Sequence, residues 1–229
     1  MPPIRLLIAL ACASFCGAQP AAPPKVLVLV RQQFKTGKTA EREKLERITA
    51  AIFNRLDVPV YWMETAAFTG PSEALFFGPY DSFEAVEQAR ATLGPLYEAH
   101  PELARLQAGI NDALSSETTI LAVRHDSPAA SGINLAQARF IRMLVVRTRP
   151  GEEPAFARDL TPSVVYEVSS GMSGPAFLIF QTMPAIADIP AANLTHGTVI
   201  EDTVYAVEPD LSHVSRAFAQ QDQSFWTKP

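Results

Sequence analysis

Five side chains suited to chemistry lie on segments that the sequence predicts to be β-strands. They are one arginine, two carboxylates and two aromatic rings: Trp62, Glu64, Arg142, Glu167 and Tyr205. An arginine among carboxylates and rings can orient an anionic or aromatic small molecule, and a desolvated carboxylate can accept a proton. The same set also suits a structural role, in which Arg142 pairs with Glu64 or Glu167 and the rings fill a core. We take these five as candidate ligand-binding residues and assign no catalytic role.

Local motifs add no metal, cofactor or nucleophile to this set. The four histidines lack the close spacing of paired metal ligands. The segment Gly171-Met-Ser-Gly174 lacks the spacing of a nucleophile elbow and is expected to be a turn. Gly37-Lys-Thr39 ends like a phosphate-binding loop, but Gln32 stands where that loop needs glycine. We predict no metal and no cofactor, and no histidine falls at a predicted interior strand position that would favour haem.

The first 18 residues have the pattern of a cleavable signal peptide. Arg5 precedes an uncharged run from Leu6 to Ser14, and small residues lead to a cleavage point near Ala18-Gln19. Both cysteines, Cys12 and Cys16, lie in this leader, so the rest of the chain is expected to form no disulfide. Neither cysteine has a leucine three places before it, as a lipidated cysteine would, so we expect cleavage without lipidation. The leader predicts a soluble protein that is secreted or periplasmic.

The hydropathy and net charge of the chain argue against a membrane span and a nucleic-acid partner. The leader's apolar run is shorter than the roughly 20 residues that a membrane span needs, and no later segment is long and apolar enough. The chain carries a formal net charge of -5, which argues against a nucleic-acid partner. The partner that we expect is a small molecule, and the alternative is a protein that binds the outer surface or the tail.

Residues 25–124 follow an exposed lead-in at 19–24 and show the β-α-β-β-α-β order of a ferredoxin-like unit. Apolar residues recur at helical spacing over 39–56, with charged residues from Glu41 to Lys44 between them. Thr69-Gly-Pro-Ser72 marks a turn between two strands, and Ser82 is suited to capping the helix that follows. The predicted elements are strands 26–30, 58–65, 73–77 and 117–124 and helices 39–56, 83–93 and 97–114.

The same order returns in residues 138–208, after a Ser-, Ala- and Gly-rich linker at 125–137. Its predicted elements are strands 140–147, 164–169, 176–180 and 201–208, with helical pieces near 154–160 and 185–192. Short matches keep their order in the two halves, such as Leu29-Val-Arg31 with Val145-Val-Arg147 and Thr69-Gly-Pro71 with Ser173-Gly-Pro175. They indicate an internal duplication; the alternative is that two α+β segments merely share strand-like composition.

Two ferredoxin-like units in one chain resemble the dimeric α/β-barrel superfamily, which includes antibiotic-biosynthesis monooxygenases and NIPSNAP-like proteins. The resemblance covers about residues 25–208 and rests on topology and the repeat, without a diagnostic catalytic motif. It implies an α+β fold in which two tandem units close an eight-stranded barrel within one chain. Such a chain needs no partner for its core, so we expect a monomer. The tail, residues 209–229, is expected to pack its aromatic residues on the barrel exterior.

Side chains alternate along a strand, so parity predicts which of them face the barrel interior. One set is expected to face the helices: Leu75, Phe77, Ile120, Ala122, Ile141, Met143 and Val145. The other set is expected to face the interior: the five candidates with Thr119, Ser169, Gln181 and Thr203. Val28, Val30, Leu144 and Val146 are also expected to meet in a shared interior.

Three functions from different classes follow. The favoured one is binding of a small molecule in the barrel interior. The second is a cofactor-independent, monooxygenase-like enzyme that uses Trp62, Glu64 and Arg142 to hold an oxidisable aromatic substrate, which requires a roomy interior. The third is an interaction or scaffold protein that acts through its outer surface and its tail. No sequence feature identifies a reaction.

Overall fold

The structure is a computed structural model that describes residues 23–125, 133–149, 163–191 and 197–227. Its strands are β1 (Val26–Phe34), β2 (Met63–Ala67), β3 (Glu73–Tyr80), β4 (Leu114–Arg124), β5 (Phe140–Arg147), β6 (Val164–Ser170), β7 (Phe177–Met183) and β8 (Thr198–Val207). Its longer helices are α1 (Thr39–Leu56), α2 (Phe83–Ala99) and α3 (Pro101–Ala113). The predicted signal peptide lies outside the described residues.

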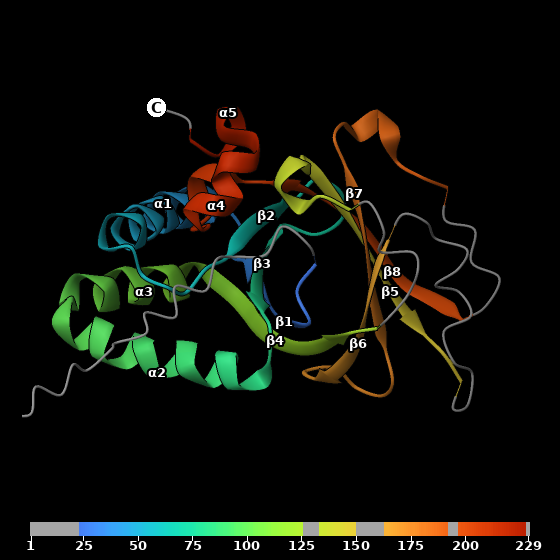
Figure 1. Cartoon of the computed structure of the whole chain (residues 1–229), viewed down its shortest axis with the longest axis horizontal. Helices are drawn as coiled ribbons and strands as arrows, with labels where there is room; N and C mark the ends of the chain where they lie inside the picture. Colours follow the sequence, from blue (N-terminus) through green and yellow to red (C-terminus); the bar gives the residue numbers. More distant parts are fainter. Residues whose placement is uncertain (1–22, 126–132, 150–162, 192–196, 228–229) are drawn as a thin grey trace, which may run out of the picture.

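The eight strands form one closed barrel in the order β1-β3-β2-β8-β5-β7-β6-β4, and every neighbouring pair is antiparallel (Figure 1). The α+β class and the eight-stranded barrel predicted from the sequence are confirmed. Strands β4-β1-β3-β2 are contiguous in the ring, and so are β8-β5-β7-β6. A closed ring leaves no unpaired strand edge, so every strand is held on both sides.

Helices α1, α2 and α3 lie on the outside of the first four strands (Figure 1). Helix α1 has the predicted bounds, and Asp57 in a left-handed conformation ends it. The Ser82 hydroxyl accepts a hydrogen bond from the backbone N–H of Ala85, which confirms the predicted cap of α2. Gly109 on α3 has no side chain to meet Leu45 of α1, so the two helices approach closely. This approach makes a compact helical cover over the sheet.

The barrel interior holds the main apolar core, and it is built from the side chains that we expected to face the helices. Leu75, Phe77, Ile141, Met143 and Val145 pack together with the equivalent residues of the other strands. The parity prediction is therefore wrong by one position on these strands. The barrel interior is shielded from water by the surrounding strands. The fold is therefore most stable when the alternate strand residues with the largest apolar side chains point into it.

The residues that we predicted to share the interior lie on the outer faces instead. Leu144 and Val146 pack in a separate apolar cluster with residues of β6 and β7. Val28 and Val30 face the helices of the first half. The same one-position error thus moves all four of these side chains out of the barrel.

Strand β2 starts at Met63, later than predicted, because the residues before it serve the helices. Val58 and Val60 pack in an apolar cluster with Phe53 of α1, and Trp62 forms an isolated bridge with His213. In the second half, the predicted helical piece at 154–160 lies outside the described residues. The piece predicted near 185–192 contains a 3-10 turn, Ile186–Asp188.

The described parts of the linker and the tail are packed rather than loose. Ala136 of the 3-10 turn Leu135–Gln137 is fully buried, and its carbonyl accepts a hydrogen bond from the Trp226 indole. Phe218, on helix α4 (Arg216–Ala219), and Trp226, on helix α5 (Gln223–Trp226), belong to the interior core. The tail therefore closes an end of the barrel instead of only covering its exterior. Within the residues that the structure describes, no helix has the length and apolar character of a membrane span.

Candidate functional site

The barrel interior is filled by side chains. The space left inside it is about 40 Å³ and is lined almost entirely by apolar side chains, among them Leu27, Ile141, Val164 and Phe180. Ligand pockets usually have volumes of several hundred Å³. The interior therefore has no room for the small molecule that the sequence analysis placed there.

The five predicted site residues do not converge. Tyr205 alone lies inside the barrel, where it is fully buried. Trp62 and Glu64 lie on the outer face of the first half, beside α1. Arg142 lies on the outer face of the second half, where Asp202 binds it through two hydrogen bonds of 2.7 and 2.5 Å, and Glu167 is exposed. These residues lie apart because, on most strands, the side chains that face the interior are shifted by one position from the prediction.

A cavity of about 510 Å³ lies between the outer face of the first four strands and helices α1, α2 and α3. Its walls are mostly aromatic and aliphatic, with a polar edge. The lining consists of Val28, Val30, Gln32, Glu46, Thr49, Phe53, Val60, Tyr61, Trp62, Phe76, Gly78, Tyr80, Leu93, Tyr97, Gln107 and Glu117. This size and composition are typical of a small-molecule site.

The aromatic walls are held in place by specific contacts. The Trp62 indole N–H donates to the carbonyl of Leu211 at 2.9 Å, and the Trp62 and Phe53 rings meet edge to face with centroids 5.0 Å apart. Burial raises the pKa of the Tyr80 and Tyr97 hydroxyls, so both stay neutral near pH 7. The cavity thus offers fixed ring faces and uncharged phenols to a ligand.

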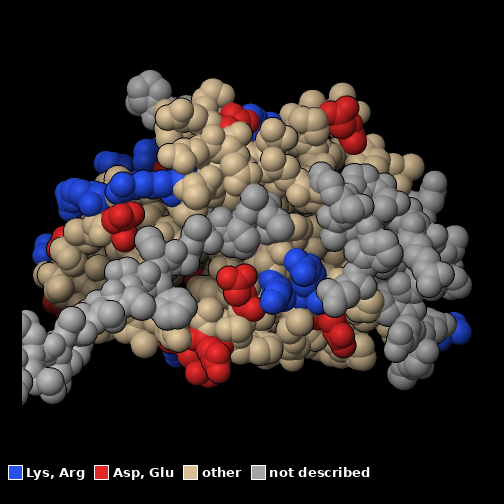
Figure 2. Space-filling view, in the orientation of Figure 1, with Lys and Arg blue, Asp and Glu red and all other residues tan. Residues whose placement is uncertain are grey.

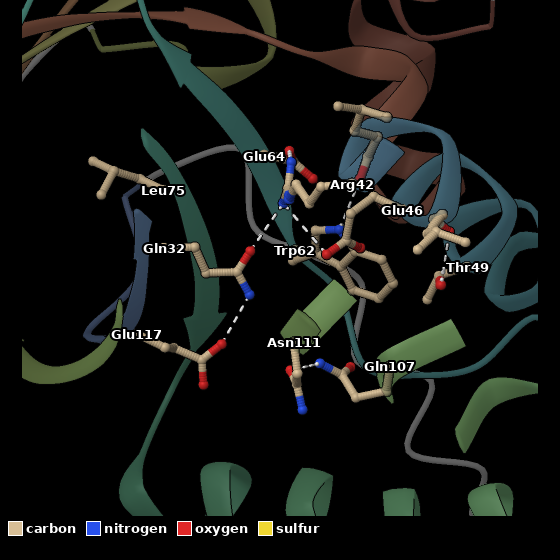
Figure 3. A network of polar contacts seen from close by, with 12 residues as sticks. Gln32, Arg42, Glu46, Thr49, Trp62, Glu64, Leu75, Gln107, Asn111 and Glu117 are labelled. Carbon is tan, nitrogen blue, oxygen red and sulfur yellow. Dashed lines mark hydrogen bonds and ion pairs between the residues drawn. The ribbon is translucent and has the colours of Figure 1, made fainter. Parts of the chain in front are cut away.

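Arg42 of α1 organises the polar edge of the cavity (Figure 3). Its guanidinium donates to Glu64 of β2, to Gln32 of β1 at 3.1 Å and to Glu46 of α1 at 3.3 Å. The Gln32 amide in turn donates to Glu117 of β4 at 2.9 Å. Four elements therefore meet in one hydrogen-bonded cluster, which we call the Arg42 cluster: Gln32, Arg42, Glu46, Glu64 and Glu117.

Burial dominates the electrostatics of this cluster. Arg42 is 1% exposed, and its guanidinium lies 5.1 and 5.0 Å from the ring centroids of Phe34 and Phe76. Desolvation raises the pKa of Glu64 to about 8, against the opposing attraction of Arg42. Desolvation also raises the pKa of Glu46, a cavity-lining carboxyl. Both carboxyls therefore hold protons more firmly than a solvated glutamate does.

A second arginine cluster lies inside the barrel, on the face of β1 opposite to Gln32. Arg31 donates two hydrogen bonds of 2.8 Å to Glu73 and one of 2.8 Å to Glu201. The Tyr205 hydroxyl donates to Glu73 at 2.5 Å. Both oxygens of Glu73 accept hydrogen bonds here, whereas Oε1 of Glu201 is buried without a partner. No cavity adjoins these groups in the part of the chain that the structure describes.

The sequence analysis predicted Trp62 and Glu64 as site residues, but not Gln32, Arg42 or Glu46. It placed Arg42 among the charged residues between the apolar positions of α1, although Arg42 is buried against the sheet. Arg42 and Glu46 stand four residues apart on one helix face, and this spacing was the only available signal. Among the described residues, no group of histidine, cysteine or acidic side chains is arranged to hold a metal ion.

No protein-family model matches the sequence, and a comparison with curated proteins finds no match. Among solved structures, the chain is similar to an anthrone oxidase-like protein, with a TM-score of 0.53 and 14% identity over 82% of this chain and 94% of that one. It is also similar to a candidate monooxygenase from Lactobacillus acidophilus, with a TM-score of 0.49 and 7% identity over 83% of this chain and 97% of that one. A candidate monooxygenase from Fusobacterium nucleatum has a TM-score of 0.48 and 10% identity over 82% and 94%. Of these three, only the anthrone oxidase-like protein has a TM-score above 0.5, and its likeness shows a shared fold.

Proposed function

We propose that this protein binds a small aromatic molecule in the cavity between helices α1, α2 and α3 and the sheet. The observation that carries the proposal is the contrast in free volume, about 510 Å³ in this cavity against about 40 Å³ inside the barrel. Six aromatic rings line the cavity: Phe53, Tyr61, Trp62, Phe76, Tyr80 and Tyr97. Flat ring faces favour a planar ligand that stacks on them or meets their edges.

Gln32 gives the ligand an orientation. Its amide oxygen accepts from Arg42 and its amide nitrogen donates to Glu117, so the side chain is held between two partners. Gln32 lines the cavity while being only 4% exposed. The nitrogen has a second N–H, which can donate to a carbonyl or hydroxyl oxygen of a bound molecule.

Intrinsic fluorescence tests this binding directly, because Trp62 lines the cavity and the chain has only two tryptophans. In a Trp226→Phe variant, Trp62 is the sole reporter. We expect 2-naphthol or indole-3-carboxaldehyde to quench its emission in a saturable way and to raise the melting temperature. A panel of such neutral aromatics that changes neither signal would contradict the proposal.

A second candidate function is oxidation of such a molecule without a cofactor, and the position of Glu46 favours it. A buried carboxylate in the wall of an apolar cavity can remove a proton from an activated CH2 group of the substrate. The carbanion then reacts with dissolved O₂, so that one oxygen atom becomes a ketone and the other leaves as water. The balanced change is CH2 plus O₂ to C=O plus H₂O, with the carbon oxidised and O₂ reduced.

Oxygen uptake tests this second candidate. Anthrone is a suitable probe, since it carries one activated CH2 group between two rings. The wild-type chain should consume O₂ and anthrone in equal amounts, and Glu46→Gln should slow this reaction while anthrone still quenches Trp62. Equal rates in both proteins would remove Glu46 from the reaction.

We also propose further properties of the chain from its sequence and its strand order. We propose that the two halves arose by duplication of a ferredoxin-like unit, which the shared strand orders β4-β1-β3-β2 and β8-β5-β7-β6 support. We propose that the chain is exported, on the evidence of its leader. Closure of the barrel within one chain supports a monomer. The tail is a poor docking peptide, since Phe218 and Trp226 are core residues and deleting residues 210–229 would remove them.

A further inference from the structure

The charged side chains in the cavity wall are acidic. Among the described residues that line the cavity, the charged side chains are the carboxyls of Glu46 and Glu117. The exposed basic residues of α1 include Lys44, Arg47 and Arg55, and they lie away from the cavity. Figure 2 shows basic side chains gathered over α1, on the outside of the molecule.

Arg42, the cation of the Arg42 cluster, does not balance the charge of the carboxyls around it. Arg42 is shared by Glu64 and Glu46, and Gln32 connects it to Glu117. The cluster therefore has three carboxyls for one guanidinium. Oε2 of Glu64 is buried without a hydrogen-bond partner, as is Nε of Arg42, so the internal pairing is incomplete.

Among the described residues, the charged groups other than Arg42 that act on Glu46 and Glu64 are all acidic. Glu208 is a further carboxylate that acts on Glu64, and the charge of Glu46 helps to raise the pKa of the Tyr97 phenol of α2. Tyr80 of β3 is a second neutral phenol in the wall. A ligand in the cavity therefore meets a field made by carboxyls and by the negative faces of aromatic rings.

We propose that the cavity selects an organic cation, a protonated or quaternary amine carried on an aromatic or aliphatic body. This inference rests on the proposed binding function and gives its ligand a charge. Ring faces attract a cation that has left water, and the carboxyls of Glu46 and Glu117 supply the counter-charge. An anion of the same shape would meet two carboxyls and no exposed base.

Binding of a cation should also release protons. Burial raises the pKa of Glu46, and it raises that of Glu64 to about 8, so without a ligand the Glu64 carboxyl is largely protonated at neutral pH. A positive ligand favours their ionised forms, and this lowers both pKa values. Affinity for the cation should therefore rise with pH between about 6 and 8, whereas affinity for a neutral ligand should stay constant.

Isothermal titration with three matched probes tests the proposal. The probes are benzyltrimethylammonium, its uncharged isostere neopentylbenzene, and the anion benzylphosphonate, each titrated into the full chain at pH 8. We expect the cation to bind at least about tenfold tighter than the neutral probe, and the anion not to bind. Buffers of different ionisation enthalpy should reveal proton release with the cation alone.

Two variants locate the effect. Glu46→Gln should weaken the cation and leave neopentylbenzene unchanged, and Glu117→Gln, at an exposed position, repeats the test without a buried change. Glu43→Gln is the matched control, because Glu43 is on α1 but does not line the cavity. If neopentylbenzene binds as tightly as the cation, charge selection is wrong while aromatic binding stands. If none of the three probes binds, both proposals fail.

Discussion

The two faces of strand β1 show how differently one sheet can be used. Arg31 points into the barrel, where Glu73, Glu201 and Tyr205 surround it in a filled core. Gln32, the next residue, points outward to the Arg42 cluster and a cavity of about 510 Å³. Each face thus has an arginine among carboxyls, yet only the outer one adjoins free space.

The difference follows from what covers each face. Inside the barrel, strands face strands, and interdigitating side chains fill the ring. Outside, the helices pack on one another through contacts such as Gly109 against Leu45, and they stand off from the sheet over Val28 and Val30. In this protein the side chains fill the barrel while the helical cover spans a hollow, which is why the site lies outside the barrel.

The largest expected effect comes from removing the outer arginine. Arg42→Met leaves Glu64 buried without its cation, so we expect unfolding free energy to fall by about 3–5 kcal/mol at pH 8. Arg31→Met should cost less, because Arg31 is 21% exposed and water can replace part of its pairing. Urea denaturation of both variants measures the two losses. Equal losses would mean that the clusters are buried alike.

Packing gives the next comparison. Leu75→Ala, in the filled interior, should lower the unfolding free energy by roughly 2–5 kcal/mol, because the neighbours cannot close the void. Val30→Ala, beside the cavity, should cost less than about 1 kcal/mol, since its side chain already borders free space. Thermal denaturation of the pair checks this contrast. A loss at Val30 as large as that at Leu75 would indicate that the cavity is closed in solution.

The pH dependence of stability distinguishes the outer cluster. The folded pKa of Glu64 is raised to about 8 and that of Glu46 is also raised, above their values in the unfolded chain. The contribution of Glu64 is therefore fully present below about pH 4.3 and is lost as pH rises through about 8. Glu64→Gln should flatten the curve of unfolding free energy against pH by roughly 1–3 kcal/mol between pH 5 and 8. An unchanged slope would show that Glu64 is ionised throughout.

The smallest expected effect concerns two phenols. Tyr205→Phe removes the hydrogen bond to Glu73 inside the barrel and should cost about 1–2 kcal/mol. Tyr97→Phe, at the cavity wall, should change stability by less than about 0.5 kcal/mol, because the half-buried hydroxyl is next to free space. Chemical denaturation of both variants measures the two losses. A larger loss in Tyr97→Phe than in Tyr205→Phe would contradict the prediction.

The sequence predicted the elements of the fold better than their orientation. The helix at 39–56, the cap at Ser82 and the eight strands follow from local spacing and turn residues, which a single sequence contains. Which parity of a strand points inward depends on whether helices or other strands cover each face. Ile141 and Leu144 are both apolar and buried, so composition alone could not decide between the two faces.

The candidate site was only partly predictable for the same reason. Trp62 was predicted to line a ligand site, and it does line the cavity, although outside the barrel. Arg142, Glu167 and Tyr205 belong to other faces of the sheet. Arg42 could not be recognised, because a charged residue on a helix usually faces solvent and only tertiary packing buries this one.

Filling one cavity at a time tests the central claim most directly. Val30→Trp places an indole in the outer cavity, and Val164→Ile adds one methylene to the small space inside the barrel. Binding of 2-naphthol is measured by isothermal titration in both variants and in the wild-type chain. We expect Val30→Trp to abolish binding without lowering the melting temperature, and Val164→Ile to bind as the wild type does. Unchanged binding in Val30→Trp, with loss of binding in Val164→Ile, would contradict the account and place the ligand inside the barrel.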